Sequence, residues 1–190
     1  MIHTIRVHAE HEYDVVVGCD WQSSLKDSLG SYTRVALVYS SAMRDHIKGF
    51  KPDNTEIHYF EVADGEGAKT SQSLQSLWNW LGAAGFTRSD AVVGIGGGTI
   101  TDLAGFAAAS WLRGIDWIAV PTTVAGMVDA AIGGKTGINS DYGKNLIGAF
   151  HSPQKVLIDT SWLTTLSDRD FAAGLAEVVK CGFIMDGKIL

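Results

Sequence analysis

A run of glycines and small polar residues follows an apolar segment in the middle of the chain. Residues 96–102 read GGGTITD, directly after the apolar residues 91–95 and before an alanine-rich segment. A strand, a tight glycine turn and a helix start together form an anion site, because the first helical amides point at the ligand and absent side chains let the backbone approach. Thr99 stands where the dinucleotide fingerprint GxGxxG has its last glycine. We therefore predict a phosphate-binding turn that departs from the standard dinucleotide signature.

A second glycine-rich segment looks like the end of an ATP-binding loop. Gly134, Lys135 and Thr136 match the last part of that loop, but position 129, where it requires its first glycine, is Asp129. We therefore predict no ATP site at these residues.

The segment 110–150 combines charged and polar residues with many glycines. Lys135 and Lys144 each follow a glycine and precede a small polar residue, which is typical of charges placed beside a close backbone. A lysine ammonium is a compact point charge that suits phosphate or carboxylate. Asp129 stands between Val128 and Ala130, so it is either a helix cap or a buried carboxylate with a cationic partner. These residues predict an anionic ligand at a sheet edge.

These segments together resemble one enzyme family. The resemblance covers the chain from about residue 64 to its end, in order and with family-like spacing, whereas the first 60 residues match only in their pattern of strands and helices. The matching runs are similar to those of the 3-dehydroquinate synthases, the second enzyme of the shikimate pathway. They are residues 96–106, 112–114, 120–123, 128–129, 133–139, 143–150 and 174–180.

The resemblance implies an NAD-dependent carbon–oxygen lyase that also uses zinc or cobalt and serves aromatic amino acid biosynthesis. It would convert 3-deoxy-D-arabino-heptulosonate 7-phosphate to 3-dehydroquinate and phosphate. NAD would oxidise a ring hydroxyl, phosphate would be eliminated beside the new ketone, and reduction and an aldol closure would follow. The cofactor carries the redox chemistry, and the protein holds geometry and charge. The family also suggests a homodimer.

The resemblance implies the site residues position by position. Arg113, Asp129, Lys135, Asn145 and Lys180 would act in catalysis or contact the substrate, and Arg113 suits the phosphate and could reach it from a dimer partner. The implied NAD-binding residues include a ribose loop, a pyrophosphate cradle and surrounding groups. They are Asp64, Glu66, Lys69, Gly97, Gly98, Thr99, Ile100, Thr101, Asp102, Thr122, Thr123, Lys135, Lys144, Trp162, Leu163, Thr164 and Thr165.

Glu177 matches the glutamate that binds the metal in this family, and Lys180 lies one helical turn later on the same face. The family's two metal-binding histidines lie in its helical C-terminal domain, and the six histidines here, at positions 3, 8, 11, 46, 58 and 151, do not match them. Catalytic zinc normally takes three protein ligands and a water, so one glutamate cannot hold it. We therefore expect this chain to bind NAD without turning over substrate.

A second departure from the family lies after the apolar residues 34–39. The family often has an acidic residue there, which holds the adenosine ribose, whereas this chain has Ser40. The ribose contact at that position is therefore not predicted.

The elements that must position these residues alternate over the first 120 residues. Apolar runs and alternating patterns predict strands, helical spacing predicts helices, and Ser40 and Ser41 are a plausible helix cap. Such alternation predicts an α/β fold with a Rossmann-like parallel sheet flanked by helices. The predicted strands are 2–7, 14–17, 34–39, 56–62, 91–95 and 117–120, and the predicted helices are 21–29, 70–81 and 100–112.

The pattern changes after residue 163. Residues 166–170 are typical of a helix start, and residues 171–184 read as one helix. We expect residues 1–160 to form an NAD-binding α/β domain and residues 161–190 to be the incomplete start of a helical metal- and substrate-binding domain. The alternative is a C-terminal helix packed on the sheet.

Composition restricts the class of protein. The 190 residues are 46% hydrophobic, enough for a core, and the net charge of −6 disfavours a general nucleic-acid binder. No apolar run reaches the roughly 18–20 residues of a membrane span, and the first residues lack a signal-peptide pattern. The two cysteines, Cys19 and Cys181, form no CxxC pair, which favours a reduced, cytoplasmic protein.

Three other functions remain open from the residues. Another sugar-phosphate cyclase would share most of these segments. A metal-dependent alcohol or glycerol dehydrogenase would share the architecture and the glycine turn, but Lys135 and Lys144 argue against it. A non-catalytic nucleotide-binding module would be complete in 190 residues and would expose no apolar face.

Overall fold

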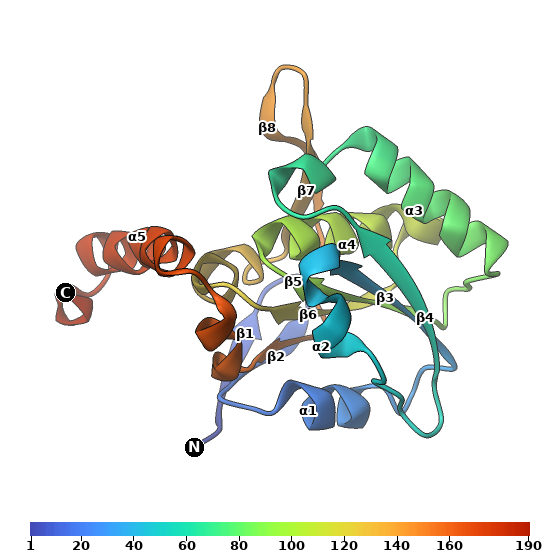
Figure 1. Cartoon of the computed structure of the whole chain (residues 1–190), viewed down its shortest axis with the longest axis horizontal. Helices are drawn as coiled ribbons and strands as arrows, with labels where there is room; N and C mark the ends of the chain where they lie inside the picture. Colours follow the sequence, from blue (N-terminus) through green and yellow to red (C-terminus); the bar gives the residue numbers. More distant parts are fainter.

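The computed structural model describes all 190 residues, arranged as a seven-stranded sheet, a separate two-stranded hairpin and five α-helices (Figure 1). The strands of the large sheet are β1 (His3–His8), β2 (Glu12–Val17), β3 (Arg34–Ser40), β4 (Glu56–Val62), β5 (Ala91–Gly96), β6 (Asp116–Pro121) and β9 (Lys155–Ile158). The hairpin is β7 (Lys135–Ser140) and β8 (Gly143–Phe150). The helices are α1 (Trp21–Ser28), α2 (Arg44–Ile47), α3 (Ser71–Ala83), α4 (Gly98–Ser110) and α5 (Asp168–Ile184).

The sheet has the strand order β1-β2-β9-β6-β5-β3-β4 and is parallel from β2 to β4. This confirms the predicted α/β fold with a mostly parallel sheet. The exception is the edge strand β1, which pairs antiparallel with β2. Only residues 9–11 separate the two strands, and so short a connection permits a hairpin but no parallel crossover.

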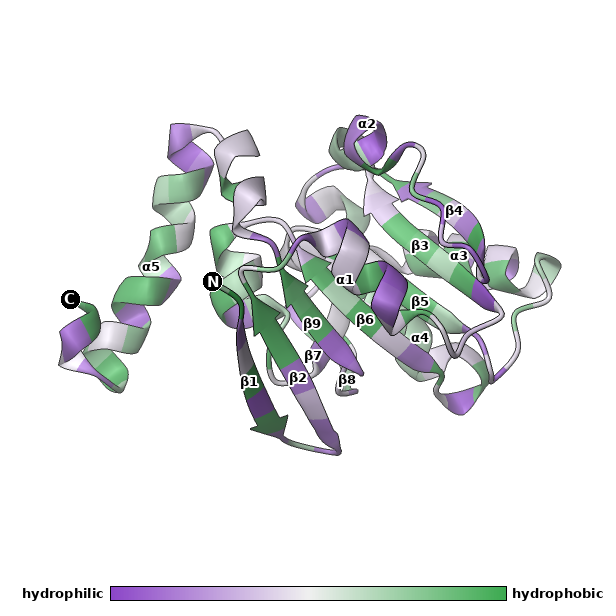
Figure 2. Cartoon of the chain, turned by 90° about the horizontal axis from the view of Figure 1, so that it is seen from below, coloured by the Kyte–Doolittle hydropathy of each residue, from purple (hydrophilic) through white to green (hydrophobic).

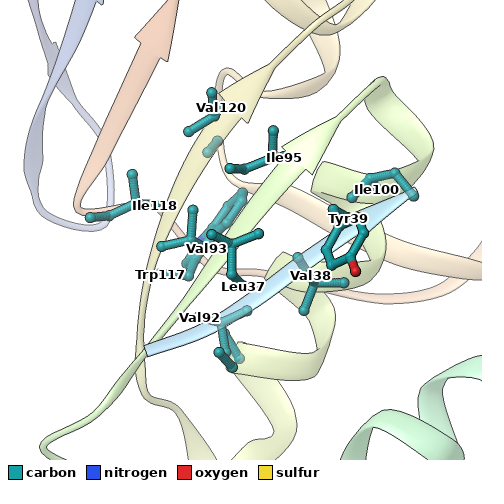
Figure 3. Packing of buried hydrophobic residues seen from close by; sticks show 14 of the residues in the cluster. Leu37, Val38, Tyr39, Val92, Val93, Ile95, Ile100, Trp117, Ile118 and Val120 are labelled. Atoms are coloured by element: carbon teal, nitrogen blue, oxygen red, sulfur yellow. The ribbon is translucent and has the colours of Figure 1, made fainter. Parts of the chain in front are cut away.

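The core lies on both faces of the central strands β3, β5 and β6, which read as nearly continuous apolar runs because helices cover the sheet on both sides. Leu37, Val93 and Ile118 lie side by side on neighbouring strands and are fully or almost fully buried (Figure 3). Helix α4 lies on one face together with α3, and α1 lies on the other (Figures 1 and 2). The small residues of α4 allow this close packing, since a Cβ at Gly105 would lie 3.0 Å from the Trp117 ring.

Side-chain caps mark the start of helices α1, α3 and α5. The Thr70 hydroxyl accepts a hydrogen bond from the Ser73 amide at 3.1 Å, and the Ser167 hydroxyl accepts one from Asp170 at the same distance. The cap predicted after β3 is different, because Ser40 precedes a short 3₁₀ turn and makes no capping hydrogen bond there. Predicted helix and strand bounds otherwise agree with the structure to within about two residues at most ends.

Helix α5 leaves the sheet and extends away from it (Figures 1 and 2), so the alternative of a C-terminal helix packed on the sheet is wrong. It contacts the rest of the chain through Gly174, where a Cβ would lie 2.5 Å from the Val124 side chain. Its apolar side chains are exposed, with Val179 43% and Phe183 77% accessible. No helix in the structure combines the length and the apolar character of a membrane span.

The hairpin β7–β8 lies within the polar segment 110–150, for which no strand was predicted. It stands off the sheet and packs along α4, where Thr136 fills the space left by Gly105 (Figure 1). The glycines and charged residues of this segment hide the apolar alternation that marks a strand.

Candidate functional site

The glycine turn lies between the carboxyl end of β5 and the first turn of α4. Side chains are excluded from it, because a Cβ at Gly96 would lie 2.6 Å from Ile100 and a Cβ at Gly98 would lie 2.8 Å from Ala130. Gly97 is the N-cap residue and has no side chain to bond the helical amides. The amides of Gly98 and Thr99, the first two of α4, therefore lack both an intrahelical partner and a side-chain cap. Free amides at a helix start are the arrangement that the sequence predicts for an anion cradle, whereas the amides of Ile100 and Thr101 donate to the Gly97 carbonyl at 2.9 and 3.2 Å.

The turn after β6 closes one side of this cradle. The Thr122 amide donates to the Gly96 carbonyl at 2.9 Å, which joins the ends of β5 and β6. The Thr123 hydroxyl accepts a hydrogen bond from the Gly126 amide at 3.1 Å, and its methyl group lies 3.1 Å from where a Gly97 Cβ would be. The structure thus brings both threonines to the glycine turn, at the edge of the sheet where open α/β folds bind ligands.

Glu66 lies in the 3₁₀ turn Glu66–Ala68, in front of the same cradle. Thr99 donates its hydroxyl to one carboxylate oxygen at 3.2 Å, and the Asn139 amide group donates to the other at 2.8 Å. Lys144 approaches the second oxygen to 3.9 Å. The hydrogen bond from Asn139 is the main cause that lowers the pKa of Glu66, so this side chain is a carboxylate at neutral pH.

Lys69 is the best-buried charged side chain of the site, with 3% exposed. Its ammonium forms an ion pair with Asp102 of α4 and donates a hydrogen bond to the Asn145 side-chain oxygen. Burial raises the pKa of Asp102, and the neighbouring Lys69 opposes that shift. One lysine therefore links the turn before α3, helix α4 and the tip of the hairpin.

Asp64 lies next to the end of β3. The family often has an acidic residue at that end, where this chain has Ser40. The Asp64 carboxylate accepts hydrogen bonds from the Ser41 hydroxyl and, at 3.0 Å, from the Ala42 amide. The bond from Ser41 is the main cause that lowers the pKa of Asp64. Asp64 is a predicted residue of the ribose loop, but the sequence did not predict that it lies beside the end of β3, because the two segments are joined only in the folded sheet.

An open cavity of about 470 Å³ lies between α4 and the hairpin. Four predicted site residues line it, namely Asp102, Asp129, Lys135 and Asn145, and Phe150 adds an apolar wall. Lys135 suits an anionic group of a ligand, while the Asn145 amide and the two carboxylates suit its hydroxyl groups.

Asp129 lies in the π-helical turn Gly126–Ala130, a rare conformation that often occurs at functional sites. Of the two alternatives left open by the sequence, the buried carboxylate is wrong as to burial, because 53% of the Asp129 side chain is exposed. Its cationic partner is present, since Lys180 of α5 donates to Asp129 at 3.2 Å. Lys180 also pairs with Glu177, and the two acidic partners raise the pKa of Lys180.

The residues of this chain do not by themselves form a metal site. Glu177 is engaged by Lys180, and no group of three His, Cys, Asp or Glu side chains in the structure is arranged to hold a metal ion. A catalytic zinc needs three protein ligands, so the donor set present here does not fit one.

Two groups of predicted residues lie away from the glycine turn. Arg113 is exposed at the far end of α4, which at 13 residues spans roughly 20 Å. Leu112 and Arg113 have φ angles of 49° and 68°, so the backbone that presents this arginine is strained. The other group, Trp162, Leu163, Thr164 and Thr165, follows β9 at the same edge of the sheet as the turn, and Trp162 is buried against Trp21.

Asn139 is the residue of the site that sequence reasoning missed. It lies within the glycine-rich run 133–139, but nothing in its neighbours indicates that it bonds both Glu66 and the Asn145 backbone. Only the three-dimensional arrangement of the hairpin reveals this role.

A family model described as "3-dehydroquinate synthase N-terminal" matches residues 59–173. The chain is 50% identical over 183 residues to a 3-dehydroquinate synthase of Streptomyces avermitilis, covering 94% of this chain and 50% of that protein. It is 45% identical over 194 residues to the one of Mycobacterium leprae, covering 98% and 53%. The chain therefore spans about half the length of the curated relatives it matches.

Solved structures of related enzymes have the same fold. A 2-deoxy-scyllo-inosose synthase complexed with carbaglucose-6-phosphate, NAD+ and Co2+ superposes with a TM-score of 0.85 at 27% identity, over 94% of this chain and 50% of that one. A 2-epi-5-epi-valiolone synthase of Streptomyces hygroscopicus with NAD+ and Zn2+ bound gives 0.85 at 30% identity, over 97% and 53%. An iron-containing alcohol dehydrogenase of Thermotoga maritima, at 18% identity and a TM-score of 0.70 over 88% and 51%, shares the fold alone.

Proposed function

This chain belongs to the 3-dehydroquinate synthase family, and on that premise we propose that it is the NAD-binding half of an enzyme that makes 3-dehydroquinate. The reaction would convert 3-deoxy-D-arabino-heptulosonate 7-phosphate to 3-dehydroquinate and phosphate. The observation that carries the proposal is the side-chain-free turn at Gly96, Gly97 and Gly98 beside a cavity lined by Lys135 and Asn145. A cofactor cradle and an anion-binding cavity therefore share one wall, helix α4.

The residues present fit NAD. The amides of Gly98 and Thr99 would hold the pyrophosphate, because helix N-terminal amides bind anions and no side chain blocks them. Asp64 and Glu66, both ionised at neutral pH, would accept hydrogen bonds from ribose hydroxyls. NAD bound there would supply the hydride acceptor and later the donor. Both cyclase structures described above contain NAD+, which supports this assignment.

The substrate would occupy the cavity between α4 and the hairpin. Lys135 would bind its anionic groups, and Asn145, held by Lys69, would orient a hydroxyl or carbonyl oxygen. Lys180, which its two acidic neighbours keep protonated, would present a cation from the side of α5. The side chains thus supply binding and orientation, with Asp129 fixing the position of Lys180.

We assign Glu177 as one ligand of the enzyme's zinc or cobalt, with the remaining ligands supplied from outside this chain. The single glutamate does not fit a metal by itself, so we derive no step through the metal.

We further propose that the enzyme is a homodimer in which Arg113 acts on the partner's site. Arg113 is exposed, makes no ion pair and lies at the opposite end of α4 from the glycine turn of its own chain. The strained backbone at Leu112 and Arg113 holds the arginine out into solvent, which favours a ligand bound by another subunit. The guanidinium group of Arg113 suits the phosphate of the substrate.

The division at about residue 160 is also a proposal. The exposed apolar face of α5 supports a helical domain that packs on it, and it disfavours a self-contained nucleotide-binding module. The cysteines, Cys19 and Cys181, are both free, which supports a reducing compartment such as the cytoplasm. We propose no nucleic-acid or membrane partner.

A second candidate is another sugar-phosphate cyclase, because the two cyclase structures superpose over nearly the whole chain. The run 133–139, with Lys135 at the cavity, favours the dehydroquinate reaction. Comparing product formation from several sugar phosphates by the full-length protein distinguishes the two.

The proposal is tested by measuring phosphate release from the heptulosonate phosphate with this chain, NAD and zinc, beside the full-length relative of Streptomyces avermitilis. We expect release by the relative and none by this chain, with NAD bound in a parallel titration. Release by this chain would show that its own residues complete the metal site.

A further inference from the structure

The hairpin ladder is interrupted at Asn139. Regular antiparallel pairs run from Lys135 opposite Phe150 to Ile138 opposite Ile147, and the next pair joins Ser140 to Gly143. Asn139 has no partner in the ladder, and residues 144–146 on the other strand are also unpaired. Such irregularities re-aim side chains and are frequent beside functional sites.

The polar groups of Asn139 bond both outside the hairpin and across its tip. The Asn139 amide N–H donates to the Lys69 carbonyl at 2.9 Å, which fixes the hairpin to the turn before α3. Its side-chain oxygen accepts from the Asn145 amide at 3.0 Å, and its side-chain nitrogen donates to Glu66 at 2.8 Å. A backbone N–H can only donate and a carboxylate can only accept, so a side-chain amide is the group that satisfies both.

Asn145 needs this support because its backbone is in the left-handed region, with φ 58°. Asparagine tolerates that conformation better than most residues, and the hydrogen bond from its amide to Asn139 helps to hold it there. Its side chain is tied to Lys69 at the same time. Asn145, in the unpaired stretch 144–146, is therefore held both by the Asn139 side chain and by Lys69.

We propose that Asn139 is a positioning residue, whose side-chain amide couples the tip of the hairpin to Glu66 and so fixes the cofactor loop and the substrate cavity as one unit. This rests on the proposed function, in which Glu66 contacts NAD and Asn145 contacts the substrate. Asn139 itself touches neither ligand. It acts through the carboxylate of Glu66 and the backbone of Asn145.

The test compares Asn139→Ala with Asn139→Asp in the 190-residue chain. Aspartate keeps an acceptor for the Asn145 amide but places a second carboxylate against Glu66. Glu66 is also faced by the cations Lys69 and Lys144 and by the acid Asp102. Two carboxylates this close share one proton as the pH falls, which restores the donor that Glu66 requires.

The first measurement is the Kd for NAD at about pH 8 and about pH 5.5. We expect Asn139→Ala to weaken NAD binding by about tenfold at both pH values, since it loses hydrogen bonds to a charged group. Asn139→Asp should weaken it at least as much at the higher pH and recover by about tenfold at the lower pH. Tyr142→Asp is the matched control. Tyr142 is 95% exposed at the same tip, so this substitution adds the same negative charge outside the hydrogen-bond network. Its NAD affinity should stay close to that of the unaltered chain at both pH values.

The second measurement is hydrogen exchange of the Asn145 and Asn139 amides without ligand. Faster exchange at Asn145 in Asn139→Ala is expected, and it does not depend on whether the chain binds NAD. Failure of the unaltered chain to bind NAD would therefore overturn the proposed function and leave the exchange result to decide the role of Asn139. Unchanged exchange at Asn145, or equal NAD affinity of the Ala and Asp variants at both pH values, would overturn the role of Asn139.

Discussion

The ammonium of Lys69 and the carboxylate of Asp102 form an ion pair inside the site, although 33 positions separate them in the sequence. Lys69 follows the turn that carries Glu66, and Asp102 belongs to the first turns of the helix that begins at Gly98. The pair thereby joins the loop assigned to the cofactor ribose with the helix assigned to its pyrophosphate.

Removing one partner of this pair is expected to destabilise the protein more than removing both. Lys69→Met leaves the Asp102 carboxylate without its cation in a largely buried place, which we expect to lower the free energy of unfolding by about 3 kcal/mol. Lys69→Met combined with Asp102→Asn should recover more than half of that loss. Urea unfolding of the single and double variants measures it, and additive losses would contradict the coupling.

The Lys69→Met variant should also depend on pH in a defined direction. Burial already raises the pKa of Asp102, and loss of Lys69 removes the group that opposes the shift. A carboxyl whose folded pKa is raised above its unfolded value stabilises the fold at low pH, and this contribution is lost as the pH rises through the folded pKa. The deficit of Lys69→Met relative to the unaltered chain should therefore shrink between about pH 7 and about pH 5. A deficit that grows on acidification would contradict this reasoning.

Asp64 is expected to respond in the opposite sense. Hydrogen bonds from Ser41 and Ala42 lower its pKa, so its contribution to stability is present above the unfolded pKa and is lost as the pH falls through the folded value. Ser41→Ala should raise the pKa of Asp64 toward that of an ordinary aspartate. An NMR titration of the Asp64 carboxyl carbon measures this, and an unchanged pKa would show that the Ser41 bond does not form in solution.

Gly98→Ala should abolish or greatly weaken NAD binding. A Cβ there would lie 2.8 Å from the Ala130 side chain, so α4 and the turn that carries Asp129 must move apart, and the amides move with them. Gly30→Ala is the matched control, because an added Cβ at that position meets nothing within 4 Å. Calorimetric titration of NAD into both variants tests this. Equal affinities would remove the glycine turn from the cofactor site.

Arg113→Ala should leave the NAD affinity of this chain unchanged within about twofold, because the arginine lies a helix length from the glycine turn. The same substitution in the full-length enzyme should raise KM for the phosphorylated substrate. A tenfold loss of NAD affinity in this chain would place Arg113 in the cofactor site instead.

The parallel sheet and the glycine turn could be predicted because each rests on a local pattern. The strands at residues 91–96 and 116–121 are apolar runs buried on both faces, and the turn between strand and helix is rich in glycine. The antiparallel edge strand at residues 3–8 differs from expectation only because its connection is too short for a crossover.

The network at the tip of the hairpin could not be predicted, because its members come from three separate segments. Asn139 looks like an ordinary polar residue, and its role follows from a β-ladder irregularity. The family resemblance implies Lys69 in the cofactor site, but its bonds to Asp102 and Asn145 follow only from the folded structure. Asp129 was also not predicted correctly. Its apolar neighbours suggested burial, whereas the π-helical turn exposes its side chain and directs it toward Lys180. Pairings of this kind depend on tertiary packing, which no local pattern encodes.

The central claim is that this chain binds NAD at the turn between β5 and α4, and a calorimetric titration of NAD into the 190-residue chain tests it most directly. Circular dichroism of the same sample establishes that the chain is folded. The account predicts saturable binding of one NAD per chain, lost in Gly98→Ala and kept in Gly30→Ala. A folded chain that binds no NAD at concentrations of about 1 mM would contradict it. A Kd of that size corresponds to a binding free energy of roughly −4 kcal/mol.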